Sequence, residues 1–370
     1  MRILLYVSIL LLWSSYLPAD EMSLNVLNFE PRHPFKPLTN EYPVEDKSQS
    51  VFVKNMPRVR SQDSFNTCYG CSSATIAQKY ICDNHPSYVG KNCSALTPDM
   101  EISQLDLISK SLTNRDGQSK GMPSNHTNIR IKDEDRKKTS GVHSLLNAQP
   151  KFSFNSELCF PFDQLVEKYG DKSIDLTDKL LKRLEDYYIS KRTEADSTCT
   201  ECLQDIDHGL NAAVTQDQFN TALKKNSFGE FLYSLIFNKQ CEKKINLPEG
   251  PNVGLFPKIN EPSQKSDLLA KLKEAIGTTS SNRPVLLGNV CLYLDKKSNQ
   301  CFTHSVVISG YKTMCNDKKT KCKSFVKVHN CWGNDWQAAN ADGWVDAENL
   351  MNNVNPNLDR LNDGVLSWYF

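Results

Sequence analysis

The sequence lacks three features that would point to nucleic acid, a membrane or a repeat architecture. Its 44 basic and 43 acidic residues leave a formal net charge of +1, so no global field attracts nucleic acid or an anionic membrane. Beyond the N-terminus, no apolar run is long enough to cross a bilayer. Internal repeats and low-complexity tracts are also missing. The remaining composition, 39% hydrophobic and 24% charged, is that of an ordinary globular protein.

The N-terminal residues have the layout of a secretory signal peptide. Arg2 is the single charge before an apolar run from Ile3 to Trp13, and a small residue, Ala19, precedes the first acidic pair. Charged, apolar and cleavage regions in this order are typical of exported proteins. The alternative is an uncleaved anchor. We therefore predict a signal peptide at residues 1–19 and a secreted protein, extracellular or periplasmic, with no membrane attachment after cleavage.

Cysteine is abundant, with thirteen residues. In an oxidising compartment cysteines persist as disulfides, and an odd number leaves at least one thiol over. Proximity along the chain favours three pairs: Cys82–Cys93, Cys291–Cys301 and Cys315–Cys322. A further group has two interpretations, a zinc site and disulfides, and consists of Cys199, Cys202, His208 and Cys241. In a secreted chain we favour disulfides, and we expect no metal or organic cofactor.

The order of patterns along the chain predicts an α+β fold, with helices first and strands later. Residues 20–56 are polar and contain prolines, which indicates an extended arm on the domain surface. Residues from about 165 to 245 have helical character, and a proline-containing connector follows at 246–265. Ser266 is expected to cap a helix that runs to Gly277. Three apolar runs, at 285–287, 305–308 and 325–328, predict short strands.

A cysteine with a chemical reason to remain reduced stands at the start of a predicted helix. Small and apolar residues recur with helical spacing from Cys68 to Ile81. The first turn of a helix favours negative charge, which lowers a thiol pKa and supplies a thiolate nucleophile. Gln62 precedes Cys68 and carries an amide that can donate to a developing oxyanion, together with the Cys68 backbone N–H. The alternative is a structural Cys68 paired with Cys71 or another cysteine.

Two later strings contain groups that would complete a nucleophilic site. His304 stands at the start of an apolar strand, where a lone histidine is usually structural. Asn330 stands at the end of another such strand, and its amide can hold an imidazole in one tautomer. Trp332 follows Asn330 and would shield that hydrogen bond from water. Together these residues predict a Cys68–His304–Asn330 triad.

The three strings, in this order, resemble the papain-like cysteine peptidases. The resemblance implies a two-lobed fold with a helical N-terminal lobe and a β-barrel-like C-terminal lobe. The peptidase domain would occupy residues 57–370. The resemblance further implies hydrolysis of peptide bonds by Cys68, His304 and Asn330, with Gln62 in the oxyanion hole. It also implies peptide or protein substrates, protein inhibitors and a monomeric enzyme. Four residues correspond to substrate-binding positions: Tyr69, Ser140, Gly141 and Trp332.

Several residues depart from the family pattern. Tyr69 stands where tryptophan is usual, and Ser140-Gly141 replaces a glycine pair. Cys71 stands where a large apolar residue is common, and Cys331 where serine is common. Either these two cysteines form an extra disulfide, or Cys71 is a buried thiol. The separation of Cys68 and His304 exceeds the family's roughly 130–150 residues by about 100. We attribute the excess to a helical, cysteine-containing insertion at about 165–265.

The arm at 20–56 is too short and too irregular to act as the helical propeptide of related proenzymes. Either the enzyme is secreted without such an inhibitor, or the insertion covers the cleft instead. The alternative function is a catalytically inactive peptide-binding protein on the same fold. A thiol acyltransferase or transglutaminase is a third possibility, against which the residues around Asn330 argue.

Overall fold

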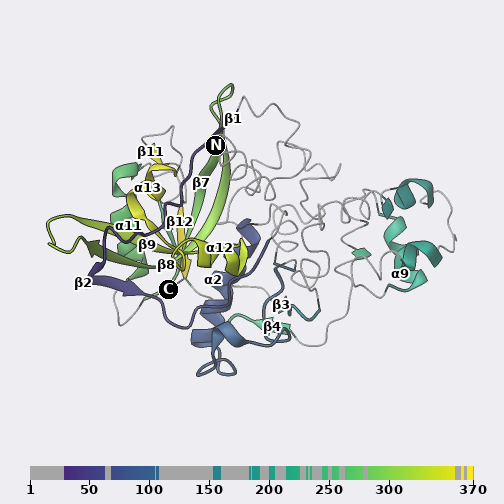
Figure 1. The fold of residues 1–370 in the computed structure, drawn as a ribbon. Coiled ribbons are helices and arrows are strands. Elements are labelled where there is room, and N and C mark those ends of the chain that lie inside the picture. Colours follow the sequence, from purple (N-terminus) through teal and green to yellow (C-terminus); the bar gives the residue numbers. More distant parts are fainter. Residues whose placement is uncertain are drawn as a thin grey trace, which may run out of the picture.

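The computed structural model describes residues 29–62, 68–104 and 282–354, together with shorter stretches. The shorter stretches are 106–107, 153–159, 183–184, 186–191, 200–204, 214–225, 231, 234–235, 244–248, 252–257, 263–277, 360–361 and 365–369. The predicted signal peptide, Ser140 and Gly141 lie outside the described residues. A large antiparallel sheet accompanied by helices confirms the α+β class (Figure 1).

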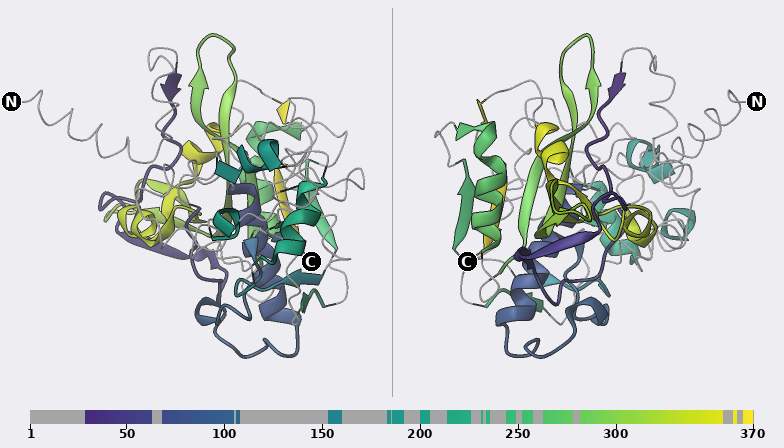
Figure 2. Two further views of the ribbon diagram at one scale, coloured as in Figure 1. Left: turned by 90° about the vertical axis from the view of Figure 1, so that its right-hand side faces the viewer. Right: turned by 60° about the vertical axis from the view of Figure 1, so that its left-hand side comes forward.

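Eight antiparallel strands form the main sheet. Their order is β10-β9-β8-β7-β12-β5, with β1 paired to β7 and β2 paired to β8. The strands are β1 (Phe29–Pro31), β2 (Val44–Phe52), β5 (Val253–Phe256), β7 (Val285–Asp295), β8 (Cys301–Cys315), β9 (Cys322–His329), β10 (Trp344–Asp346) and β12 (Leu366–Tyr369). The three predicted apolar runs lie in β7, β8 and β9. All three strands extend further than their apolar residues, and β7 and β8 project as a long hairpin with β1 alongside (Figure 2).

The other elements are short. The helices are α2 (Cys68–Asn84), α9 (Gln216–Leu223), α11 (Leu268–Ile276), α12 (Gly333–Ala339) and α13 (Ala347–Asn352), with 3-10 turns at Cys93–Ala95 and Lys265–Asp267. Two small sheets pair β3 (Ser153–Asn155) with β4 (Lys244–Asn246) and β6 (Ser263–Gln264) with β11 (Arg360–Leu361). In the described part of the chain, no helix combines the length and apolarity needed to span a membrane.

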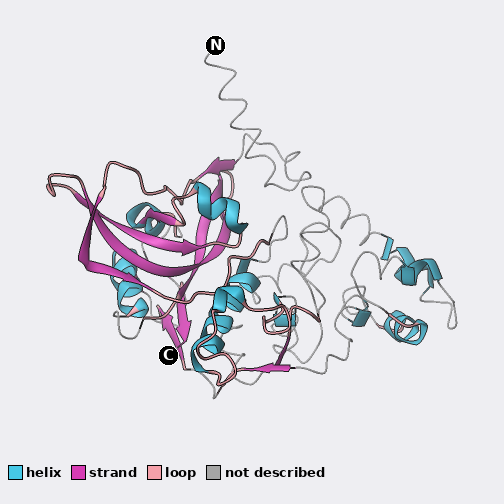
Figure 3. Ribbon diagram, turned by 60° about the horizontal axis from the view of Figure 1, so that its bottom comes forward, coloured by secondary structure: helices cyan, strands magenta, loops and turns pink. Residues whose placement is uncertain are grey.

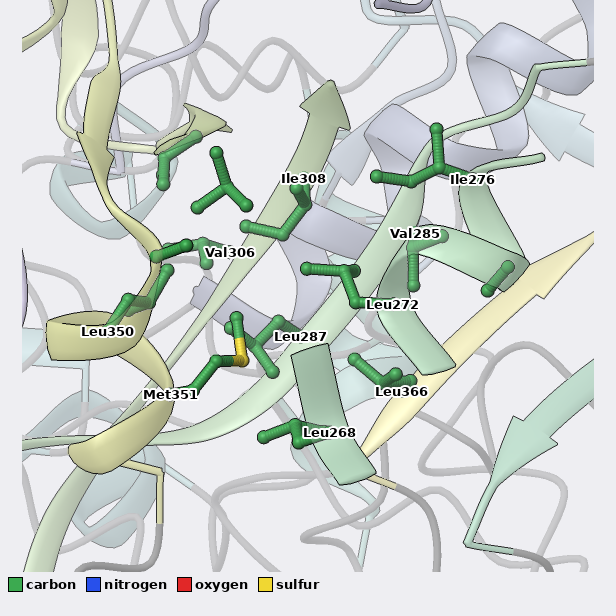
Figure 4. Close-up of a cluster of buried hydrophobic side chains, with 14 of the residues drawn as sticks. Leu268, Leu272, Ile276, Val285, Leu287, Val306, Ile308, Leu350, Met351 and Leu366 are labelled. Atoms are coloured by element: carbon green, nitrogen blue, oxygen red, sulfur yellow. The ribbon is translucent and has the colours of Figure 1, made fainter. Parts of the chain in front are cut away.

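The middle of the sheet is buried on both faces, which explains the short continuous apolar runs at 285–287 in β7 and 306–308 in β8. Because successive side chains of a strand point to opposite faces, Leu287 and Val306 join a core with α11 and α13 (Figure 4). Their neighbours Leu286 and Val307 join a second core with α2. The sheet therefore holds α2, whose first residue is Cys68, against the start of β8.

A third cluster of buried residues belongs to the predicted insertion. It includes Leu184, Tyr188, Phe219 and Phe231, and it lies apart from the main sheet (Figures 1 and 3). The helix α9 begins with a capping box in which Thr215 and Gln218 bond reciprocally. Helices are thus present among the described residues of this region, whereas β4, β5 and β6 place strands within the bounds predicted for a helical insertion.

The structure differs from the sequence prediction in three segments: the arm, the connector and the start of α11. The arm does not merely lie on the surface, because β1 and β2 are strands of the main sheet. The connector at 246–265 contains β5, which pairs with β12 in the same sheet. Ser266 lies in a 3-10 turn, and the N-cap of α11 is Asp267 without a side-chain cap bond. The helix ends as predicted, with Gly277 at a φ of 86°.

Disulfides connect the described elements. The three pairs expected from proximity, Cys82–Cys93, Cys291–Cys301 and Cys315–Cys322, are all present. A fourth, Cys71–Cys331, settles the alternative left open by the sequence in favour of a bridge. Cys202 is also disulfide-bonded, as favoured over zinc, whereas Cys199, His208 and Cys241 lie outside the described residues.

Candidate active site

His304 and Asn330 meet as the sequence predicted. The His304 Nε2 lies 2.8 Å from the Asn330 Oδ1, and both side chains are buried. The same Oδ1 accepts the backbone N–H of Cys331 at 2.8 Å. A backbone N–H only donates, so this contact identifies the atom as the amide oxygen. His304 must then donate from Nε2, which leaves the Nδ1 of the neutral imidazole with its lone pair.

Trp332 covers this pair. Its ring stacks on the His304 ring with centroids 4.6 Å apart and an angle of 22° between the planes. Asn330 is further held through its backbone N–H, which donates to the Gln337 Oε1 at 3.4 Å. The predicted shielding of the hydrogen bond by Trp332 is therefore consistent with the observed packing.

Two contacts hold the first turns of α2 beside His304 and Asn330. The Ser72 hydroxyl donates to the carbonyl oxygen of Ser305 at 2.9 Å, next to His304 in the chain. The Cys71–Cys331 disulfide joins the helix to the residue after Asn330, with Cα atoms 6.3 Å apart. Because residues i and i+4 share a helix face, Cys68 lies on the face of Ser72, one turn closer to the N-terminus.

Cys68 is present as a thiol rather than as half of a disulfide, and it is partly exposed. It is the first residue of α2, where backbone N–H groups lack partners within the helix. These groups and the helix dipole favour a negative charge on the sulfur. Tyr69 belongs to the same turn, and its side chain lies outside what the structure describes.

The segment that contains Gln62 runs beside the asparagine. Gln62 is buried, and its backbone N–H donates to the carbonyl oxygen of Cys331 at 2.7 Å. Ser61 forms an isolated β-bridge with Trp332, and the Gly333 N–H donates to the backbone carbonyl oxygen of Arg60 at 3.2 Å. The backbone of Gln62 therefore lies next to Cys331, which is joined to α2 by a disulfide. The predicted role of its side-chain amide in an oxyanion hole requires a position close to this helix.

Burial controls the protonation of the histidine. It lowers the pKa of His304 from 6.5 to about 4, against a smaller opposing effect of the hydrogen bond to Asn330. The imidazole is thus neutral near pH 7 and can accept a proton through Nδ1. Among the described residues, no group of three or more histidine, cysteine, aspartate or glutamate side chains is arranged to hold a metal ion.

Sequence reasoning missed one residue of this site. Phe35 packs against Trp332, with ring centroids 5.6 Å apart and planes at 90°. It also contacts Trp336 and lies 6.3 Å from the His304 ring. A phenylalanine between a proline and a lysine in a polar arm gives no local signal of such a contact. The remaining predicted residues, Ser140 and Gly141, fall outside the described part of the chain.

Comparisons with known proteins do not assign the chain. No protein-family model matches it, and no curated protein matches it in sequence. The assignment of function therefore depends on the arrangement of the residues described above.

Proposed function

We propose that this protein is a secreted cysteine peptidase with a papain-like, two-lobed arrangement. The observation that carries the proposal is the buried hydrogen bond from His304 to Asn330 beside the N-terminus of the helix that begins at Cys68. A thiol at a helix start, a neutral imidazole and an orienting amide are the groups required for acyl transfer through a thioester.

Each side chain has a role in the proposed reaction. The Cys68 thiol transfers its proton to His304 Nδ1, and the thiolate attacks the carbonyl carbon of a peptide. The imidazolium then protonates the leaving amine, and a thioester remains on Cys68. Water attacks the thioester with His304 as base, which releases the acid and restores the thiol. Asn330 holds the ring so that Nδ1 faces the sulfur throughout.

Charge develops on the carbonyl oxygen during both attacks. The Cys68 backbone N–H and the Gln62 amide are the proposed donors to this oxyanion. The substrates would be peptides or proteins bound near Tyr69 and Trp332, and the strand around Ser140 and Gly141 would pair with their backbone. No cofactor is required for this chemistry.

Two properties support secretion. The N-terminus has the pattern of a signal peptide, and four disulfides join described cysteines. Disulfides of this number persist mainly in oxidising compartments.

A covalent probe tests the proposal. Wild-type protein and the variant Cys68→Ala would be treated with an epoxide thiol probe and assayed on a mixed fluorogenic peptide library. We expect labelling at Cys68 and hydrolysis in the wild type, and neither in the variant. Hydrolysis that persists in Cys68→Ala would contradict the mechanism. Peptide binding without hydrolysis or labelling in the wild type would instead identify an inactive binding protein.

A further inference from the structure

The strap, residues 29–38, is the part of the N-terminal arm that crosses the candidate active site. It begins with β1, which pairs with β7, and the Arg32 N–H then donates to Leu292 at 2.9 Å. At its other end, Pro37 forms a bridge with Val345, and Leu38 donates to Trp344 at 2.8 Å. The strap is therefore fixed on both sides of the site.

The middle of the strap is fixed as well. The Asn349 side-chain amide donates to the carbonyl oxygens of His33 at 2.9 Å and of Pro34 at 2.7 Å. The Asp346 N–H donates to Lys36 at 2.8 Å. Phe35, between these contacts, is held with its ring toward the indoles of Trp332 and Trp336.

The ring of Phe35 completes an aromatic group around the catalytic imidazole. Its plane stands nearly perpendicular to His304, Trp332 and Trp336, at 83°, 90° and 81° respectively. Edge-to-face contacts of this kind are favourable and directional. Trp332 stacks on His304, so a ring that fixes the indole also fixes the imidazole plane.

The arm continues from the strap into the body of the domain. Strand β2 pairs along β8, and Val51 and Val53 are buried in the core shared with α11. Gly310 of β8 has no side chain where β2 passes, and a Cβ there would lie 2.9 Å from the Val51 carbonyl oxygen. The sheet is therefore built around the arm, and excision of the arm would remove two of its strands.

We infer that the strap belongs to the active enzyme and that Phe35 is a positioning residue that holds Trp332 and His304 in place. This inference rests on the proposed peptidase function. It goes beyond the expectation of an extended arm on the domain surface, and it excludes residues 29–38 from any propeptide that is removed on activation.

The strap offers a matched control. Phe29 lies in β1, and its ring contacts Phe302 in the β7–β8 hairpin with centroids 5.2 Å apart. Phe29→Ala removes an aromatic contact of the strap without touching the Trp332 group. Phe35→Tyr keeps the ring, whereas Phe35→Ala removes it.

The experiment compares kcat and KM of these variants on one fluorogenic peptide, together with the rate at which the thiol probe labels Cys68. Misplacement of a catalytic group by about 1 Å can cost roughly a hundredfold in rate. We expect Phe35→Ala to lower kcat by about tenfold to a hundredfold with little change in KM. Phe35→Tyr should restore most of the rate, and Phe29→Ala should retain it.

Intact-mass measurement of the probe-labelled wild type provides a second reading if Phe35→Ala does not fold. The labelled species should still contain residues 29–38. A labelled species that starts after residue 38, an unchanged or increased kcat in Phe35→Ala, or an equal loss in Phe29→Ala would overturn the inference alone. Absence of labelling in the wild type would overturn the proposed function, and the inference with it.

Discussion

The sheet carries two buried histidines in two regions that differ in what surrounds them. His304 lies near the start of β8, and His329 is the last residue of β9. Burial lowers the pKa of both from 6.5 to about 4. By exposure and protonation alone, the two side chains cannot be distinguished.

Their partners separate them. His304 donates to a side-chain amide, Asn330, and stacks on an indole. The Nε2 of His329 lies 3.3 Å from the backbone carbonyl of Arg58, and the residue lines a groove of about 670 Å³ with Lys312 and Lys327. The first turns of α2 contact the residue after His304, through the hydrogen bond from Ser72 to Ser305. The proposed role of His304 therefore rests on its orienting partner and on the adjacent helix α2, because a lowered pKa is common to both histidines.

The sharpest way to break this comparison is to remove each imidazole in turn. General acid–base catalysis contributes about 10² to 10⁴-fold, and loss of the proton acceptor also leaves the thiol largely protonated. We expect His304→Ala to lower kcat by about 10³-fold or more. His329→Asn, at a site with no proposed contact to substrate, should change kcat by less than about threefold. Steady-state assays on one peptide would measure both.

A comparable loss of kcat in the two variants would mean that each histidine supports activity by stabilising the fold. Circular dichroism of each variant, recorded at the assay temperature, distinguishes this outcome from a catalytic effect. Equal losses in two fully folded variants would contradict the assignment of His304 as the base.

The next effect concerns the disulfide that joins α2 to the region of His304. Cys71 and Cys331 are 260 residues apart in sequence, whereas Cys315 and Cys322 are 7 apart. Loop-closure entropy assigns about 5.5 kcal/mol to the long loop and about 2.5 kcal/mol to the short one. Replacing both cysteines of the first pair by serine should destabilise the protein more, and should also lower kcat because it loosens Cys68 from His304. Urea unfolding and peptide assays measure the two effects.

The control is the corresponding replacement of Cys315 and Cys322, at the far end of the β8–β9 hairpin. We expect it to retain kcat at a temperature where the protein is folded. Loss of activity in both double variants, at equal folded fractions, would show that the Cys71–Cys331 bridge has no special relation to the site.

Acid should destabilise the two regions alike. The unfolded state binds a proton at each histidine below pH 6.5, whereas the folded state does so only near pH 4. The contribution of each histidine to the free energy of unfolding is therefore fully present well above pH 6.5. It is lost as the pH decreases from 6.5 toward 4. Between pH 7.5 and 4.5 each histidine should remove about 2–3 kcal/mol from the free energy of unfolding. Urea titrations at the two pH values would measure the total change, to which carboxyl groups with lowered pKa, such as Asp46 and Asp295, also contribute.

His329→Asn sharpens this result because it removes one titrating group and leaves the other. The difference in unfolding free energy between the two pH values should shrink by about the share of one histidine. An unchanged difference would mean that His329 is protonated in the folded protein at pH 4.5, and hence that burial does not hold its pKa down.

The sequence predicted the part of the fold whose causes are local. Apolar runs in β7, β8 and β9, the helix after Cys68 and the short-range disulfides all follow from neighbouring residues. The polar strand β2 was missed, because VEDKSQSVF alternates weakly and only Val51 is buried. Its pairing with β8 depends on Gly310, which is distant in sequence.

The same distinction applies to the candidate site. His304, Asn330 and Trp332 were predicted to lie together because each stands in a recognisable string, and their side chains are in contact in the structure. The Cys71–Cys331 bridge remained one of two alternatives, since neither residue carries a local signal of its partner. Phe35 was not identified at all, because its role arises only where the strap meets an indole almost three hundred residues later in the chain.

The smallest expected effect tests what distinguishes the two histidine regions, the side-chain amide. Asn330→Ala removes the acceptor of the His304 Nε2–H and leaves a buried donor unsatisfied. The imidazole can then rotate or adopt the other tautomer, so we expect kcat to fall by about tenfold to a hundredfold. Asn340→Ala is the control, since its amide donates to the Trp336 carbonyl at the end of α12. A loss confined to Asn330→Ala would show that orientation, added to burial, makes His304 a base. Wild-type kcat in that variant would mean that His304, like His329, is a buried structural histidine.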